Sequence, residues 1–454
     1  MSDKNRNDQS EFIIEKIKER PINRKKLMRR TIITAAMAVI FGLIACFTFL
    51  VLEPIISNWL YPEEKPQIVL FPEDDEEMSP EEMLNDTMHE LQQGGQNPQQ
   101  QSKEEVDPKP EGVTIEENQV QEILNSVVLD KESYRELYAS LSTYVKELNR
   151  SMVTITAITA DTDWLNTVSE SSYLSSGVII ANNTIEFLIL TEYDPIRNAK
   201  QLMVEFYNGV QTTGSLKQYD TTTDLAIVAV EISVFSKDFL ENIMIAKLGS
   251  SNKYDMVGSP VVALGNPMGT IDSIGYGVIV GENYLYETDG KYKILQTDIY
   301  GSKNAGGVLF NLDGEIMGVI TESQSSDMSN LVVAYGISNL RKIIEKLSNE
   351  IPIPYSGVEG MDVSSDVNRN FNVPLGAYVK EVKKNSPAML AGIQQGDIIV
   401  GVDDITITNY NAYITMLMNK EAGDDIQIKL MRQSQEEYKE MTIMITLGEK
   451  GKEE

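Results

Sequence analysis

The chain has 454 residues, too many for one ordinary core, which favours two or three folded units joined by linkers. Its formal net charge of -29 makes nucleic acid and anionic lipid poor ligands for the folded part, because like charges repel. A single cysteine, Cys46, rules out an intramolecular disulfide, and a single histidine, His89, restricts every site that would need an imidazole.

A transmembrane helix is predicted over residues 31–52, which carry no charge. At about 1.5 Å per residue, this stretch spans a hydrocarbon core of about 30 Å. A cleaved signal peptide, the competing interpretation, would be shorter and followed by small residues, whereas Glu53 and Pro54 follow here.

Arginines and lysines concentrate in the basic N-terminus, residues 1–30, and disfavour translocation of that end. We therefore expect a single-pass cell-membrane protein with its N-terminus in the cytoplasm and its folded domains outside. The alternative for the basic run, a nucleic-acid patch, is disfavoured by its position beside the apolar helix.

Residues 53–113 are predicted to form an acidic disordered linker. Residues 61–120 hold 17 acidic residues against three lysines, and seven of the 16 prolines. Such a segment cannot bury enough apolar surface to offset its ordering entropy. It is expected to act as a tether, with an acidic binding arm as the alternative. His89 lies here without the second histidine of a zinc-protease motif, so no metal site is predicted.

Residues 114–148 are predicted to form two lead-in helices, because apolar residues recur there at helical spacing. A self-association surface is the alternative role. From Ser151 onward, short β-prone runs alternate with turn residues, and QLMVEFY alternates apolar and polar positions. Residues 149–350 are therefore predicted to form a closed, mainly β barrel or sandwich.

Several segments of this region occur in a familiar order. They are SSGVII, ILT, TDLAIV, VVALGNPMG, LQTD, AGGVLFNLDGEIMGV and AYGIS. In this order and spacing, over residues 152–347, the chain resembles the HtrA-type serine proteases. The resemblance implies a trypsin-like double β-barrel with an active site in the cleft between the barrels.

The resemblance also assigns the triad positions. Asp224, in TDLAIV, is the retained triad acid, whereas Asp194 stands where the family has histidine and Ala305 where it has the nucleophilic serine. Lys303 replaces a glycine that shapes the oxyanion loop, and the segment before Ala305 is one residue shorter than usual. The sequence therefore predicts a catalytically degenerate member.

The chemical consequence is severe. Loss of the nucleophile or base of such a triad lowers the catalytic rate by a factor on the order of 10⁶. Alanine cannot form an acyl-enzyme, and Asp194 cannot protonate a leaving amine as an imidazolium does. Ser302 with Lys303 as a base is the alternative catalytic pair, but only if Lys303 were desolvated. Without the histidine and the serine, Asp224 would be a structural carboxylate that accepts loop N–H groups.

Residues 351–454 resemble a PDZ domain. Pro352 and Pro354 end the preceding helix, and SPAMLAGIQQGDIIVGVDD matches the PDZ pattern closely. The resemblance implies that an extended peptide binds by strand addition, with its terminal carboxylate captured by backbone N–H groups. The implied peptide-binding residues are Ser356, Gly357 and Val358 of the loop, with Ile414 and Leu417 of the facing helix. The alternative for the last two is that they only fill the core.

These observations predict a membrane-anchored HtrA-like pseudoprotease that binds extracytoplasmic peptides or protein C-termini, in envelope protein quality control or regulation. It could join homo-oligomers or hetero-oligomers with HtrA-like subunits. An active endopeptidase with non-standard catalytic residues is the main alternative, and a purely structural envelope protein is a third. No phosphate loop or cofactor motif is present in the sequence, so no cofactor is predicted.

Overall fold

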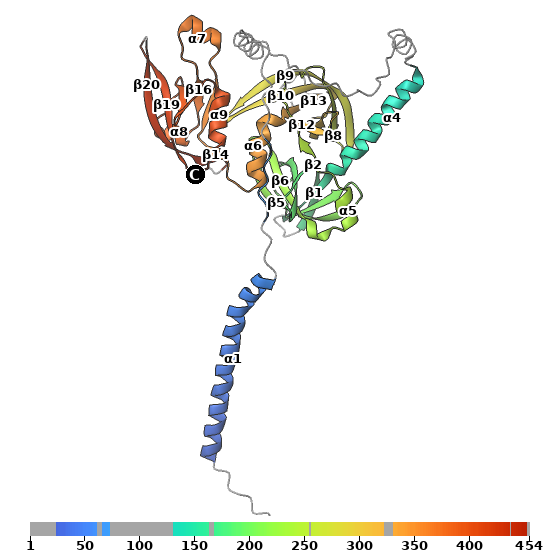
Figure 1. Ribbon diagram of the computed structural model, residues 1–454, viewed down its shortest axis with the longest axis vertical. Helices are drawn as coiled ribbons and strands as arrows, with labels where there is room; N and C mark the ends of the chain where they lie inside the picture. The colour runs from blue at the N-terminus through green and yellow to red at the C-terminus, as the bar shows by residue number, and fades with distance from the viewer. Residues whose placement is uncertain are drawn as a thin grey trace, which may run out of the picture. The chain divides into compact units, whose positions relative to one another are not determined.

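The computed structural model describes residues 24–60, 66–72, 130–162, 168–253, 256–321, 330–435 and 437–451. The chain divides into two units, Met1–Lys65 and Pro66–Glu454. In the first unit, one helix, α1 (Arg24–Leu60), contains an apolar stretch, Met28–Thr48, long enough to cross a membrane (Figure 1). The helix begins before the predicted span because lysine, arginine and leucine are good helix formers. Most of the predicted acidic linker, including His89, lies outside the described residues.

The second unit begins its regular structure with α4 (Lys131–Leu148). Asp130 caps this helix by accepting the N–H groups of Glu132 and Ser133. The helix covers the second of the two predicted lead-in runs, and the first lies outside the described residues. Val145 and Leu148 are the buried residues of α4, so only its last turns pack on the domain that follows.

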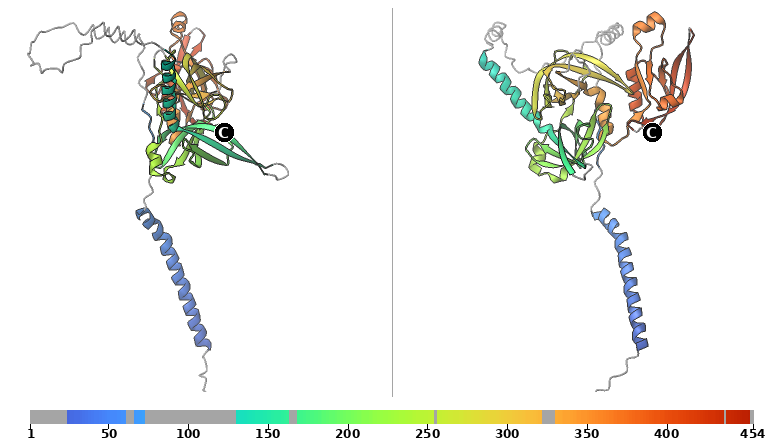
Figure 2. Two further views of the ribbon diagram at one scale, coloured as in Figure 1. Left: turned by 90° about the vertical axis from the view of Figure 1, so that its right-hand side faces the viewer. Right: turned by 180° about the vertical axis from the view of Figure 1, so that it is seen from behind.

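The first barrel is closed by six strands in the order β1-β2-β3-β6-β5-β4. Burial in β4 alternates as the sequence predicted, because successive strand side chains point to opposite faces. The β1–β2 hairpin extends well beyond the barrel wall (Figure 2). The strands are β1 (Met152–Thr162), β2 (Val168–Asn182), β3 (Glu186–Glu192), β4 (Gln201–Phe206), β5 (Gln211–Asp220) and β6 (Leu225–Glu231), with the short helices η1 (Asn149–Ser151), η2 (Ile232–Val234) and α5 (Lys237–Asn242).

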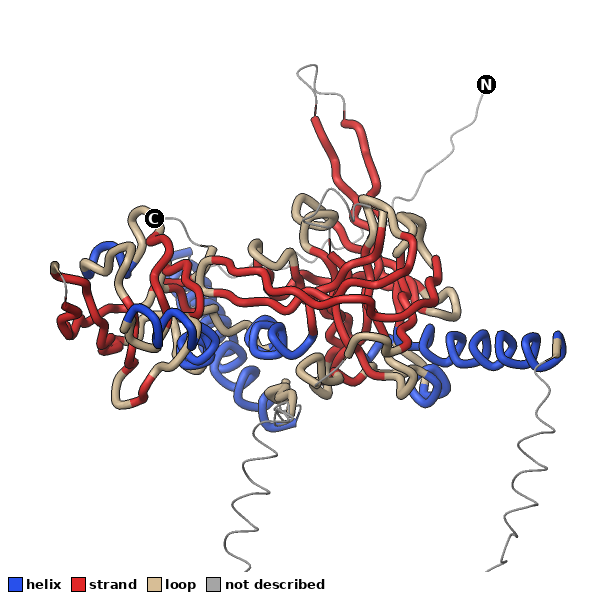
Figure 3. Tube along the Cα trace, turned by 90° about the horizontal axis from the view of Figure 1, so that it is seen from above, coloured by secondary structure: helices blue, strands red, loops and turns tan. Residues whose placement is uncertain are grey.

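The second barrel follows the order β11-β8-β9-β10-β13-β12 and is closed by pairing of β11 with β12. A short strand, β7, adds in parallel to β12. Its β9–β10 hairpin reaches out of the barrel to the C-terminal domain (Figure 3). The strands are β7 (Lys247–Leu248), β8 (Pro260–Asn266), β9 (Ser273–Glu287), β10 (Gly290–Tyr300), β11 (Gly306–Phe310), β12 (Glu315–Thr321) and β13 (Leu331–Gly336).

Helix α6 (Ile337–Ser348) packs against both barrels. Its apolar residues recur three or four positions apart, so they form one buried stripe. This stripe consists of Ile337, Leu340, Ile343, Ile344 and Leu347, which share a core with residues of both barrels. The double-barrel trypsin-like fold predicted from the sequence is confirmed.

The C-terminal domain contains a six-stranded sheet, in which five strands follow the order β15-β16-β17-β19-β20 and β18 pairs with β17. Its strand β15 lies at one edge, where a further strand can add. Gly396 opens the turn before β17 with φ of 92°, a conformation that favours glycine. The elements are β14 (Pro354–Tyr355), β15 (Val358–Asp362), α7 (Ser365–Phe371), β16 (Ala377–Val382), α8 (Pro387–Ala391), β17 (Ile398–Val402), β18 (Ile405–Thr406), α9 (Tyr410–Met418), β19 (Asp425–Ser434), β20 (Glu437–Thr446) and β21 (Gly448–Glu449).

Candidate functional site

The two aspartates assigned to the triad lie next to each other. Strands β3 and β6 are paired, and Glu192 at the end of β3 lies opposite Leu225 at the start of β6. The connections beyond these ends therefore meet, and the Asp194 N–H donates to Asp224 Oδ1 at 2.7 Å. The retained acid thus accepts a backbone N–H of the residue that replaces the histidine.

Asp224 is held in an unusual environment. Its φ of 56° lies in the left-handed region, which aspartate tolerates better than most residues. Burial raises the pKa of this carboxyl to about 6, although the hydrogen bond from the Asp194 N–H opposes the shift. The Asp194 side chain is exposed and pairs with Arg197 at 3.2 Å. The Asp194 carboxylate is therefore engaged with a surface cation.

Ala305 lies immediately before β11 and is 8% exposed. Its N–H donates to the Ser302 carbonyl oxygen at 3.1 Å, and the Asn304 N–H donates to the Ser302 hydroxyl at 3.3 Å. In a trypsin-like protease, the N–H of the nucleophile position helps to bind the oxyanion. Here this N–H points back into its own loop, and an incoming carbonyl would have to displace an existing hydrogen bond.

A third carboxylate lies beside this loop. A Cβ built on Gly306 would come within 2.5 Å of both Glu192 carboxylate oxygens, so the Glu192 side chain reaches the residue next to Ala305. Glu192 was not predicted as a site residue from the sequence. Its place in LTEYDP, two residues before Asp194, was the available signal.

The alternative catalytic pair does not have the environment that it would need. Lys303 is exposed, so it is not desolvated. The Ser302 hydroxyl accepts the Asn304 N–H, and the only histidine of the chain, His89, lies outside the described residues. Within the described ranges, no group of three His, Cys, Asp or Glu side chains is placed to hold a metal ion.

The predicted carboxylate-binding loop does contact a carboxylate, and it belongs to the same chain. Ser356 and Gly357 donate their N–H groups to Asp289 Oδ2 at 2.7 Å each, and Val358 donates to Oδ1 at 3.2 Å. The Ser356 hydroxyl also donates to Oδ1. The three predicted loop residues therefore converge on Asp289, which forms the β9–β10 turn with Thr288.

Asp289 is fully buried, and this burial raises the pKa of its carboxyl. The hydrogen bonds from Gly357 and Ser356 oppose that shift, as does the positive charge of Lys450. The Lys450 side chain is 6% exposed and pairs with Asp220 at 3.5 Å. The carboxylate is thus held by loop donors, and the charge of Lys450 acts on it.

Helix α9 faces the loop through two tyrosines that the sequence analysis did not name. The Tyr413 hydroxyl donates to Ser356 Oγ at 2.7 Å, and the Tyr410 hydroxyl lies 2.9 Å from the Val358 carbonyl oxygen. Leu417 is 1% exposed, within the C-terminal core, and Ile414 is half-buried between that core and the barrel-domain core.

The two folded parts of the chain match family models. Residues 175–319 match the trypsin-like peptidase domain, and residues 351–444 match the PDZ domain. The serine protease Do-like HtrA of Bacillus subtilis is 28% identical over 343 residues, which cover 69% of this chain and 73% of that protein. The serine protease Do-like HtrB of the same organism is 30% identical over 279 residues, which cover 57% of this chain and 59% of the relative.

Other relatives match over a smaller part of their length. The chain spans 57% of a DegP-like periplasmic serine endoprotease from Halomonas elongata and 51% of one from Rickettsia prowazekii. Among solved structures, the HtrA-type protease AlgW with a decapeptide has a TM-score of 0.51 at 19% identity and covers 68% of this chain and 99% of that chain, which shows a shared fold. By domain content, sequence and fold, the chain belongs to the HtrA-type family of trypsin-like serine proteases with a PDZ domain.

Proposed function

We propose that this member of the family is a membrane-anchored pseudoprotease that binds extracytoplasmic peptides or protein C-termini through its PDZ domain. The observation that carries the proposal is the state of the nucleophile position. Ala305 has no hydroxyl, and its N–H donates a hydrogen bond to the Ser302 carbonyl oxygen.

Acyl transfer in this fold needs a hydroxyl to attack, an imidazole to take and return the proton, and N–H donors for the oxyanion. Ala305 has no hydroxyl and Asp194 has no imidazole. The N–H of Ala305 already donates to an acceptor within its own loop. Asp224 then acts as a structural carboxylate that orders the Asp194 turn.

The PDZ loop, in contrast, keeps the means to bind an anion. Three consecutive N–H groups, those of Ser356, Gly357 and Val358, converge on a single carboxylate. This is the arrangement by which such domains capture a peptide C-terminus. A solved relative, AlgW, is described with a decapeptide. We therefore expect a peptide carboxylate to be the ligand of this loop.

Membrane anchoring is supported by the Met28–Thr48 stretch of α1, with mean hydropathy of 2.3, and by the arginines and lysines that precede it. The periplasmic relatives support an extracytoplasmic location for the folded domains. In that place, a non-hydrolysing peptide binder would serve envelope quality control or regulation, alone or in oligomers with HtrA-like subunits.

Incubation of the full-length chain in detergent with casein and with a fluorophosphonate probe tests the loss of hydrolysis. We expect no cleavage and no label on residues 149–350, beside an active HtrA-type protease that shows both. Labelling that disappears in Ser302→Ala would instead support the active-endopeptidase alternative.

Titration of the same protein with a library of C-terminal peptides tests binding. Gly357→Ala should abolish it, because φ is 87° and the new Cβ would lie 2.1 Å from Ser386 Cβ, which distorts the loop. Gly423→Ala is the matched control, because its φ is 95° but the new Cβ would meet no atom within 4 Å. Equal binding by the two variants would contradict the assignment of this loop.

A further inference from the structure

We propose that the β9–β10 hairpin is a built-in ligand of the PDZ groove, and that a peptide C-terminus binds by displacing Asp289 from the loop. This inference rests on the proposed function, because it concerns the regulation of the same groove. It predicts that the groove is closed at rest and that binding is coupled to separation of the hairpin from the PDZ domain.

The first observation is that Asp289 occupies the position of a terminal carboxylate. Both of its oxygens accept N–H groups from the loop, and one of them also accepts the Ser356 hydroxyl. Loop N–H groups that hold a buried carboxylate cannot hold a second one, since each N–H donates one strong hydrogen bond. A peptide carboxylate and Asp289 therefore compete for the same donors.

The second observation is that the hairpin tip pairs with the edge strand as a peptide would. Thr288 forms an antiparallel bridge with Glu359 of β15, and the Asp289 N–H donates to the Val358 carbonyl oxygen at 2.8 Å. The other edge of β15 is already paired with β16. The hairpin thus takes the only edge of β15 at which strand addition could occur among the described elements.

The third observation concerns the opposite wall of the groove. The Tyr410 hydroxyl of α9 lies 3.0 Å from the Glu287 carbonyl oxygen of the hairpin and 2.9 Å from that of Val358. One tyrosine therefore bridges the helix, the hairpin and the edge strand. The hairpin lies between β15 and α9, where an added peptide strand would lie.

The flank of the hairpin is held by a charge cluster at the far end of β15. Lys291 pairs with Asp362 at 2.6 Å, and the Tyr286 hydroxyl donates to the same carboxylate at 3.2 Å. The Lys291 ammonium also lies 4.7 Å from the centre of the Tyr284 ring. Although burial would raise the pKa of Asp362, Lys291 and the Tyr410 N–H lower it overall. These contacts are polar, and polar contacts can be exchanged for water when the hairpin leaves.

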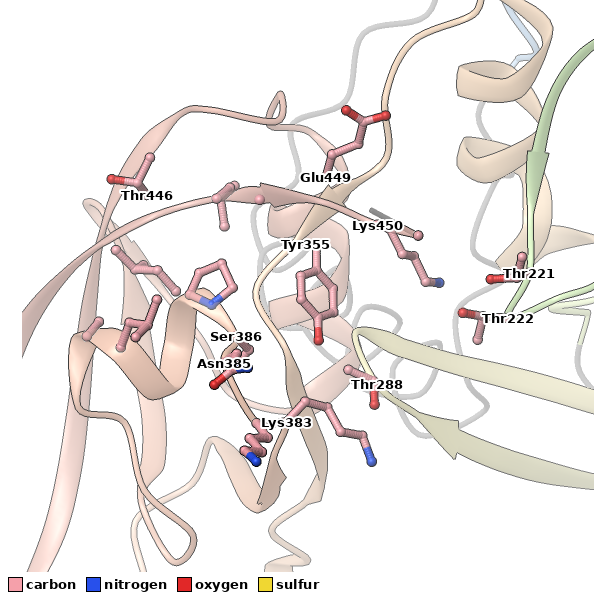
Figure 4. Close-up of a pocket in the computed structure, with 18 of the residues that line it drawn as sticks. Thr221, Thr222, Thr288, Tyr355, Lys383, Asn385, Ser386, Thr446, Glu449 and Lys450 are labelled. Atoms are coloured by element: carbon pink, nitrogen blue, oxygen red, sulfur yellow. The ribbon is translucent and has the colours of Figure 1, made fainter. Parts of the chain in front are cut away.

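The hairpin tip also borders a cavity of about 1120 Å³ between the barrel domain and the PDZ domain. Figure 4 shows Thr288 at the tip of the hairpin, near Tyr355 and Lys383 of the PDZ domain, with Thr221 and Thr222 across the cavity. At the tip, Asp289 is therefore buried against the PDZ loop, whereas Thr288 borders the cavity. The cavity therefore leaves open space beside Thr288, the residue next to the buried Asp289.

The size of the effect follows from competition. The apparent Kd of a peptide equals its intrinsic Kd divided by the fraction of molecules with an open groove. An open fraction of about one tenth would weaken apparent binding about tenfold. Removal of the internal carboxylate should recover that factor.

The first experiment compares peptide affinity in three full-length proteins in detergent. The probe is a pool of fluorescent decapeptides that end in Val, Leu or Phe with a free carboxylate, and the same pool as C-terminal amides. Asp289→Ala should bind the free-acid pool at least about tenfold more tightly than the unaltered chain, and neither should bind the amides. Asp272→Ala is the matched control, because Asp272 also lies in a hairpin turn at positive φ, on the β8–β9 connection, but is exposed. Equal affinity of the unaltered chain and Asp289→Ala would overturn the proposal.

A second variant closes the groove covalently. Paired residues of antiparallel strands have Cα atoms about 4.5–5.5 Å apart, within the range of a disulfide. Thr288→Cys with Glu359→Cys, in a Cys46→Ser background, should therefore form a disulfide between hairpin and edge strand. Oxidised protein should lose peptide binding, and reduction should restore it. Unchanged binding by the oxidised protein would show that the peptide does not need this edge.

A third measurement separates closure from peptide binding. Hydrogen exchange at the Gly357 and Val358 amides reports their hydrogen bonds to Asp289 without any peptide. Exchange should be faster in Asp289→Ala than in the unaltered chain or Asp272→Ala. Equal exchange would overturn closure. Faster exchange with no peptide bound by any variant would keep the closure and contradict the proposed function.

Discussion

In the barrel domain, the loop before Ala305 turns its N–H groups inward, whereas in the PDZ domain the loop before Val358 presents three N–H groups to one carboxylate. In an active trypsin-like protease the first loop helps to bind an oxyanion, and we propose that the second binds a peptide carboxylate. The barrel loop satisfies its donors with its own carbonyl and hydroxyl oxygens. The PDZ loop satisfies its donors with Asp289 from another domain. Backbone N–H donors must find an acceptor in both loops. Where the acceptor belongs to the same loop, the site is lost; where it comes from another domain, a ligand can displace it.

The largest expected effect tests whether the barrel site is lost. Ala305→Ser alone should leave kcat/KM for a casein peptide on the order of 10⁶ below that of an active HtrA-type protease, because Asp194 supplies no imidazole to take and return the proton. Ala305→Ser with Asp194→His should remain at least about 100-fold below, because the Ala305 N–H is donated to Ser302. Steady-state cleavage measures both variants. Full activity of the double variant would show that the hydrogen bond from residue 305 to the Ser302 carbonyl oxygen does not block the oxyanion site.

The next effect tests the scaffold of the PDZ groove. Arg432 donates from two nitrogens to both oxygens of Asp397 at 2.7 Å, and Asp397 is 1% exposed. Arg432→Ala should destabilise the PDZ domain by about 3–5 kcal/mol, because the buried Asp397 charge loses its cation and keeps the Gln394 N–H. Urea unfolding followed by hydrogen exchange within residues 351–451 measures the loss. Arg369→Ala removes an exposed pair with Asp366 and should cost less than about 1 kcal/mol. Equal losses would contradict the role of Arg432.

A smaller effect tests the contact between α9 and the loop. Tyr413→Phe removes the hydroxyl that donates to Ser356 Oγ, with little change in shape. We expect a loss of about 1 kcal/mol in PDZ stability. Tyr378→Phe, on the half-buried face of β16, is a suitable control and should change stability less. No difference between the two would show that the Tyr413 hydroxyl does not support the loop.

The smallest effect concerns the retained acid of the barrel site. The pKa of Asp224 is about 6 in the folded chain and near 3.8 when unfolded, so folding takes up a proton between these values. Asp224→Asn should therefore be more stable than the unaltered chain above pH 6, by less than about 1 kcal/mol, since Asp224 is partly exposed. The advantage should shrink from pH 6 to pH 4 and vanish below it. Urea unfolding at pH 4, 5, 6 and 8 measures it, and an advantage that grows as pH falls would contradict the burial account.

Local patterns predicted a closed β structure, and the family resemblance implied the double barrel, the PDZ domain and the loop of Ser356, Gly357 and Val358. Alternation in QLMVEFY and the SPAMLAGIQQGD stretch are examples. Asp289 was not predicted, because it meets Ser356 across 67 residues of sequence, and an Asp-Gly pair by itself indicates only a hairpin turn. The wall of the groove was also missed. In α9, YNAYITMLM is apolar on more than one face, so spacing alone did not separate Tyr410 and Tyr413 from Ile414 and Leu417.

The central claim is that this chain keeps peptide recognition and has lost peptide hydrolysis. One titration tests both at once: the full-length Asp289→Ala chain is incubated with the free-acid decapeptide pool, and bound fraction and peptide mass are followed together. Our account predicts saturable, reversible binding with every peptide recovered intact. Recovery of cleaved peptides whose formation requires the barrel domain would contradict it.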